Sequence, residues 1–145
     1  MKRINEYKKL FNVEPDTDLK VLKTTYRNLV KEWHPDKFST SDEQALEAEL
    51  KSKQIIDGYH FLVSIAPETI AANKEEYIAN TESGIADFKL KGQMLEVSFL
   101  DGSTYEYFGV SKNIYIRLIN ADKQLRFAKR NIFDSYLYRK AKRAA

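Results

Sequence analysis

The 145-residue chain has no cysteine and only two histidines, His34 and His60. The lack of cysteine excludes disulfides, thiolate nucleophiles and most structural zinc sites. The sequence also has no Gly-rich phosphate loop, no metal-ligand cluster and no Ser/His/acid elbow. We therefore expect neither an enzyme nor a metal or other cofactor, and the cysteine-free composition fits a reducing cytoplasm.

Long apolar runs are missing as well. No stretch approaches the ~20 residues that span a bilayer, and the charged residues 1–10 contain no apolar segment of the kind found in a secretory signal. We expect a cytoplasmic protein that does not enter a membrane. What is present is an ordinary globular composition, 43% hydrophobic and 31% charged. The net charge of +3 is uneven, since the surplus of basic residues lies after residue 82.

The first half of the chain has a helical pattern, from about residue 4 to residue 80. We expect helices at about 5–11, 18–32, from 43 onward, and from Pro67 to Asn80. In the second of these, apolar residues that include Leu22 and Trp33 recur on one face, so we expect Trp33 in the core. Pro35 ends this helix. The two long helices should pack antiparallel and leave the intervening loop exposed at one end.

After residues 81–84 the apolar period changes from helical to alternating. Leu95, Val97 and Phe99 alternate with polar residues, Asp101-Gly102 is a hairpin signal, and Ser111 can cap a following helix. The fold class is therefore α plus α+β. We expect an all-α domain over residues 1–82 and a small antiparallel sheet with helices over residues 83–145, which should fold alone.

A tripeptide follows the second predicted helix, His34-Pro35-Asp36. Asp36 offers a carboxylate for a charge-assisted bond to an arginine of a partner, Pro35 fixes the backbone direction, and His34 can hydrogen-bond across the loop mouth. The alternative interpretation is a helix end with a proline stop and a solvated aspartate. The run from Tyr26 to Trp33 that leads into the tripeptide makes a specific motif more credible than a chance tripeptide.

This run and tripeptide resemble the signature of the J-domain, and residues 53–62 resemble the third helix of that family. The resemblance covers about residues 5–80 and implies a four-helix domain with an antiparallel helical hairpin. It also implies a non-enzymatic co-chaperone that binds a DnaK-type chaperone and stimulates its ATP hydrolysis. No Gly/Phe-rich or zinc-binding region follows, so the chain does not resemble a full-length general DnaJ.

Four basic residues, the basic row, recur at helical spacing before the tripeptide and fall within an 80° sector at 100° per residue. They are Lys20, Lys23, Arg27 and Lys31. A solvated helix face is the alternative. In J-domains the corresponding helix meets an acidic chaperone surface, which implies a DnaK-binding set. The set is His34, Pro35, Asp36, Lys37 and the basic row.

Two residues depart from the family pattern. Ser52 stands where the family often has Phe, and we expect its hydroxyl to loosen the packing against the second helix. Phe38 stands where a polar residue is commoner.

Residues 83–140 resemble the KTSC domain, through the run from Tyr105 to Val110 and the run from Tyr136 to Arg139, among other matches. That resemblance implies a fold more than an activity. Basic residues interleaved with tyrosines suit single-stranded nucleic acid; alternatively, the tyrosines are core residues and the lysines keep the segment soluble. The candidate RNA-binding residues are Arg117, Lys123, Arg126, Lys129, Arg130, Tyr136, Tyr138, Arg139 and Lys140.

Two functions follow from the sequence. The first is a co-chaperone whose residues 83–145 direct a DnaK-type chaperone to a client protein. The alternative is an RNA- or ribosome-associated module that uses the basic C-terminal domain.

Overall fold

A computed structural model describes residues 2–14, 17–34 and 42–141 of the chain. It divides into two compact units, one formed by Lys2–Ile70 and the other by the residues from Ala71 onward. Within the described ranges, no helix combines the length and the apolar character that crossing a membrane requires.

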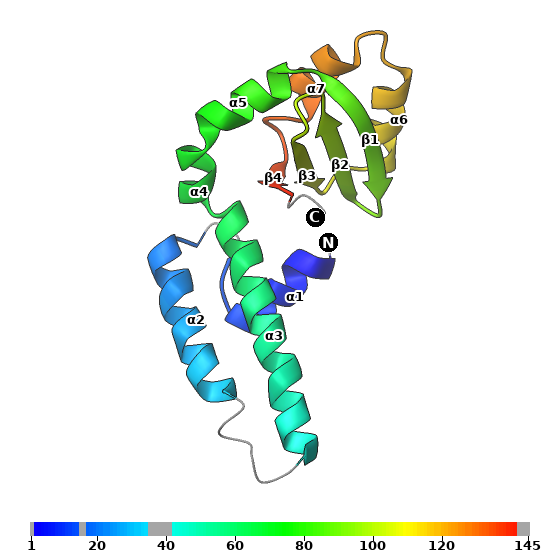
Figure 1. The fold of residues 1–145 in the computed structure, drawn as a ribbon. Coiled ribbons are helices and arrows are strands. Elements are labelled where there is room, and N and C mark those ends of the chain that lie inside the picture. The colour runs from blue at the N-terminus through cyan, green and yellow to red at the C-terminus, as the bar shows by residue number, and fades with distance from the viewer. Residues whose placement is uncertain (1, 15–16, 35–41, 142–145) are drawn as a thin grey trace. The chain divides into compact units, whose positions relative to one another are not determined.

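The first unit is helical. It contains α1 (Lys2–Phe11), α2 (Leu19–Trp33), α3 (Asp42–Ile65) and most of α4 (Pro67–Ala72). Figure 1 shows α2 and α3 side by side and antiparallel, which confirms the predicted hairpin. The helix predicted from Pro67 to Asn80 is interrupted at Asn73, so that α4 is followed by a separate α5 (Lys74–Glu82).

Helix α2 has well-defined ends. The Asp18 side chain accepts a hydrogen bond from the Val21 N–H at 2.9 Å, and the Glu68 carboxylate accepts one from the Leu19 N–H at 2.8 Å. These bonds satisfy two of the N–H groups that have no partner inside a helix. At the other end His34 is extended, with φ −62° and ψ 130°, because the residue before a proline avoids the helical region.

The core of this unit lies between the hairpin and α1. Leu22 of α2 is buried, as is Ile55 of α3, and the rings of Tyr26 and Tyr59 stack at 4.2 Å across the hairpin. Gly58 lets α1 approach closely, since a Cβ there would lie 2.8 Å from the Tyr7 ring. Ile56, the next residue of α3 after Ile55, is 43% exposed on the outer side of the helix.

The second unit is built on an antiparallel sheet of β1 (Ile85–Lys91), β2 (Met94–Phe99), β3 (Thr104–Phe108) and β4 (Leu137–Lys140), in that order. Helices α6 (Lys112–Asn120) and α7 (Gln124–Asn131) lie between β3 and β4 along the chain. Leu95, Val97 and Phe99 are buried, as the alternation predicts, and the Ser111 hydroxyl caps α6. Leu118 of α6 is buried, whereas its neighbour Ile119 is 46% exposed.

Helix α5 packs onto this sheet through Tyr77. The Tyr77 ring stacks on Tyr138 at 4.0 Å and meets Tyr105 edge-on at 5.0 Å, and its hydroxyl bonds Tyr107 and the Phe133 carbonyl. The sequence places a boundary between residues 82 and 83, because the apolar period changes there. The structure divides the chain after Ile70, because the buried face of α5 belongs to the second core.

Candidate functional site

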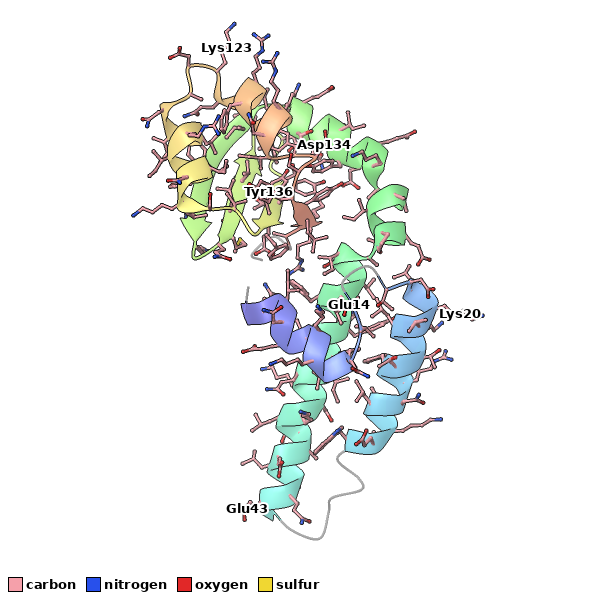
Figure 2. The ribbon with its side chains drawn as sticks, turned by 180° about the vertical axis from the view of Figure 1, so that it is seen from behind. Glu14, Lys20, Glu43, Lys123, Asp134 and Tyr136 are labelled. Atoms are coloured by element: carbon pink, nitrogen blue, oxygen red, sulfur yellow. The ribbon has the colours of Figure 1, made fainter. Side chains whose placement is uncertain are left out.

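The basic row lies along the outer face of α2. All four of its side chains are exposed, as the 80° sector beside the apolar face predicts. Figure 2 shows the Lys20 side chain extending from α2 on the side away from α3. Spacings of three and four residues place successive cations about one turn apart along the helix axis, so the four form one positive strip about three turns long.

The row leads to His34, the exposed residue at which α2 ends. An exposed side chain at a helix end can contact a partner without any rearrangement of the core. Pro35, Asp36 and Lys37, the other members of the predicted set near this helix end, lie outside the described residues, as does Phe38. The described part of the set is therefore the basic row together with His34.

Two residues of α3 hold the last residue of α2. The Ser52 hydroxyl donates a hydrogen bond to the Trp33 carbonyl at 2.9 Å, and the Lys51 ammonium lies 5.5 Å from the centre of the Trp33 ring. Trp33 is half-buried, whereas the sequence predicts a core residue. Its ring is partly open to solvent and lies near a cation.

Sequence reasoning missed this role of Ser52. The sequence shows the departure from the family's Phe, and it predicts looser packing there rather than a hydrogen bond. A hydrogen bond to a backbone carbonyl depends on the three-dimensional approach of α3 to the end of α2, and no pattern within either helix encodes it.

The predicted RNA-binding residues separate into two groups. Lys123, Arg126, Lys129 and Arg130 are exposed on or next to α7, and Figure 2 shows Lys123 extending outward just before that helix. Arg117, on α6, is also exposed, with its guanidinium 5.3 Å from the centre of the Phe127 ring. These five residues form a candidate polyanion-binding surface.

The residues near β4 are engaged within the unit. Tyr138 is 8% exposed and stacks on Tyr77 in the core, so the prediction that it stacks on a base is wrong. Arg139 is also 8% exposed and lies 3.3 Å from the Glu106 carboxylate, its neighbour on β3, so its prediction as a phosphate contact is wrong as well. The burial of Tyr138 and the ion pair of Arg139 both depend on the register of β4 against β3, which the alternation of residues in the sequence does not determine.

Two further predicted RNA-binding residues, Lys140 and Tyr136, are at least partly exposed to solvent. Lys140 forms an ion pair with Glu76 of α5, and hydrogen bonding to this ammonium lowers the pKa of the Glu76 carboxyl. Tyr136 is half-buried, and Figure 2 places it near the Asp134 end of the segment after α7. Neither residue adds a free cation to the surface around α7.

Comparison with known families agrees with the order of the two units. The DnaJ domain family matches residues 6–67, and the KTSC domain family matches residues 82–136. The chain contains a J-domain followed by a KTSC domain. The J-domain match ends before α5, in keeping with the structural division after Ile70.

Two curated relatives match part of the chain. Co-chaperone protein HscB homologs from Shewanella denitrificans and Colwellia psychrerythraea are each 46% identical to the chain over 59 residues. The matched stretch is 39% of this chain and 34% of each relative. The chain therefore spans about a third of the length of the curated relatives it matches.

Proposed function

We propose that this protein is a co-chaperone whose J-domain binds a DnaK-type chaperone and stimulates its ATP hydrolysis. The observation that carries the proposal is the exposed basic row of α2, which leads directly to the exposed His34 and on, in sequence, to Pro35 and Asp36. The J-domain match and the HscB relatives support the same function. A cytoplasmic location and the absence of an enzymatic activity of its own belong to this proposal.

The proposed division of labour follows from charge and geometry. The basic row supplies long-range attraction to an acidic chaperone surface and orients the hairpin on it. His34 and Asp36 then make the specific contacts, with the Asp36 carboxylate accepting a charge-assisted bond from a chaperone arginine. Lys37 adds one more cation next to the tripeptide. In this scheme the chain itself neither forms nor breaks a covalent bond.

The test is single-turnover ATP hydrolysis by purified DnaK, with and without the full chain. We expect the wild-type chain to accelerate hydrolysis, and we expect His34→Gln and Asp36→Asn to abolish the acceleration. Both substitutions are close in volume to the residues that they replace, so the chain should stay folded, which circular dichroism checks. Failure of the wild-type chain with several DnaK-type chaperones would refute the proposal, and full activity of both variants would remove the tripeptide from it.

The KTSC domain is proposed to direct the chaperone to a client or partner protein. Its supporting observation is that the domain folds around its own aromatic core, with exposed surface left for another molecule. Removing the domain should leave ATPase stimulation intact, while it abolishes client delivery. Pull-down with the full chain, compared with the chain ending at residue 70, would identify the client.

An RNA- or ribosome-associated role is the second candidate. It is favoured by the exposed cations around α7, which have no acidic neighbour in the described ion pairs. Binding through phosphates alone should weaken with a log–log salt slope of about −0.7 per phosphate contacted on single strands. Titration of the full chain with single-stranded RNA at low and physiological salt tests this, with Lys129→Glu/Arg130→Glu as the variant. No binding at low salt would reject it.

A further inference from the structure

We propose that Ser52 and Lys51 are positioning residues for ATPase stimulation: they hold Trp33 and thereby fix the direction in which His34 leaves α2. This inference rests on the proposed co-chaperone function. Ser52 and Lys51 are consecutive residues of α3, and both contact the single residue that precedes His34.

The hydrogen bond acts on the backbone itself. The Trp33 carbonyl is one of the last in α2, and carbonyls in the last turn of a helix have no partner within the helix. The peptide bond is planar, so the Trp33 carbonyl oxygen lies in one rigid plane with the N–H and the Cα of His34. A donor at 2.9 Å on that oxygen therefore restrains the orientation of the whole Trp33–His34 peptide.

The cation acts on the other end of the same residue. The Lys51 ammonium lies 5.5 Å from the Trp33 ring centre, within the ~6 Å range over which a cation is attracted to an aromatic face. With the carbonyl bonded and the ring covered, Trp33 is held at its backbone and its side chain. Rotation about the end of α2 then requires both contacts to break.

This arrangement explains what a serine gains at position 52. A phenylalanine, frequent there in the family, can fill space but donates no hydrogen bond. The chain thus has a directional, half-buried hydrogen bond at the residue that precedes His34. Such a bond controls orientation more tightly than apolar contact does.

The first test needs no chaperone, because Trp33 is the sole tryptophan of the chain. We expect Ser52→Ala to increase acrylamide quenching of Trp33 fluorescence and to lower its anisotropy, and Lys51→Met to do the same. Ser52→Thr keeps a hydroxyl and should stay near wild type. Ser64→Ala is the matched control, since the Ser64 hydroxyl also donates to a carbonyl of α3 but within the helix, far along it from Trp33. Unchanged Trp33 fluorescence in Ser52→Ala would overturn the inference.

The second test is DnaK stimulation by the same variants over a range of concentrations. We expect Ser52→Ala to lower the maximal stimulation by about two- to tenfold, the factor that corresponds to one net hydrogen bond. The half-maximal concentration should change less, since the basic row sets encounter and is intact. Ser52→Thr should restore the maximum, and Ser64→Ala should keep it.

The outcomes separate the inference from the function on which it rests. Looser Trp33 with an undiminished maximum would overturn the positioning role and leave the co-chaperone function standing. A wild-type chain that never stimulates DnaK would refute both, while the fluorescence test still reports whether Ser52 and Lys51 hold Trp33. Thermal melting followed by circular dichroism identifies a variant that merely unfolds; Ser52→Thr and Lys51→Met then remain as the decisive pair.

Discussion

The hydroxyl oxygens of Tyr77 and Tyr107 lie 2.8 Å apart in the core of the second unit and join α5 to β3. The Tyr77 hydroxyl donates its proton to the Phe133 carbonyl, also at 2.8 Å, so the Tyr107 hydroxyl must be the donor of the pair. One tyrosine therefore links a helix, a strand and the segment after α7. Helix α5, most of which precedes the KTSC match at residues 82–136, thereby belongs to the core of the second unit.

Tyr77→Phe should destabilise the second unit by about 1–3 kcal/mol, because it leaves the Tyr107 hydroxyl and the Phe133 carbonyl without their partner in a buried place. Tyr138→Phe is the matched control. Its hydroxyl is buried with no hydrogen-bond partner among the described residues, so its removal should be neutral or slightly stabilising. Urea unfolding followed by tyrosine near-ultraviolet circular dichroism measures both, and equal losses would contradict this account.

Alkaline pH should weaken the second unit. Burial raises the pKa of Tyr138 to about 12, and burial raises the pKa values of Tyr77 and Tyr107 as well. Unfolded tyrosines ionise near pH 10, so the unfolded chain loses these protons first. The stability from these groups is complete below about pH 10 and falls as the pH rises toward 12, by at most about 1.4 kcal/mol per pH unit for each tyrosine.

Urea midpoints between pH 9 and pH 11.5 would measure this effect, and Trp33 fluorescence reports the first unit in the same samples. The double variant Tyr77→Phe/Tyr138→Phe should show a shallower decline. A midpoint for the second unit that stays constant over this range would refute the prediction.

A segment that begins at Ala71 should fold better than one that begins at residue 83. The shorter segment lacks Tyr77, and removing a large buried aromatic side chain typically costs about 3–5 kcal/mol. A unit of this size has only a small free energy of unfolding. The expectation that residues 83–145 fold alone remains a prediction, to be compared directly with residues 71–145 by circular dichroism and thermal melting. Equal melting temperatures would mean that α5 adds little.

Charge reversal in the basic row should slow association with DnaK. Arg27→Glu should lower the association rate, and the wild-type rate should fall with added salt, because steering contributes about 10–10³-fold and is screened beyond about 10 Å at 0.1 M salt. Lys9→Glu is the control: it changes the net charge equally but lies on α1 and outside the row. If stopped-flow association responds equally to both variants, only the net charge matters and the row has no special role.

Local patterns predicted the elements because each has a strong local cause. The amphipathic period defines α2, Ser111 caps α6, and the alternation of Leu95, Val97 and Phe99 defines β2. The break at Asn73 was missed because no proline or glycine marks it. The break precedes the helix whose Tyr77 stacks on Tyr138, a long-range contact that no local pattern encodes.

The candidate site was only partly predictable, for a related reason. The exposed cations of α2 follow from their helical spacing, which can be read directly from the sequence. Whether Tyr138 faces the core or solvent depends on the register of β4 against β3, where Tyr107 is its partner. The Ser52 bond depends on which residues of α3 pass the end of α2. Both are contacts between residues far apart in the sequence, and a local sequence pattern does not determine them.

The sheet order has a consequence for the protein during its synthesis. Strand β4 pairs with β3 and brings Tyr138 into the core, so the second unit cannot complete its sheet until residue 140 has left the ribosome. The J-domain, complete near residue 70, emerges earlier by about 4–14 s at 5–20 residues per second. During that interval the nascent chain contains a folded J-domain and a second unit whose aromatic core is still incomplete. A chaperone recruited by the J-domain would therefore be bound while the second unit folds.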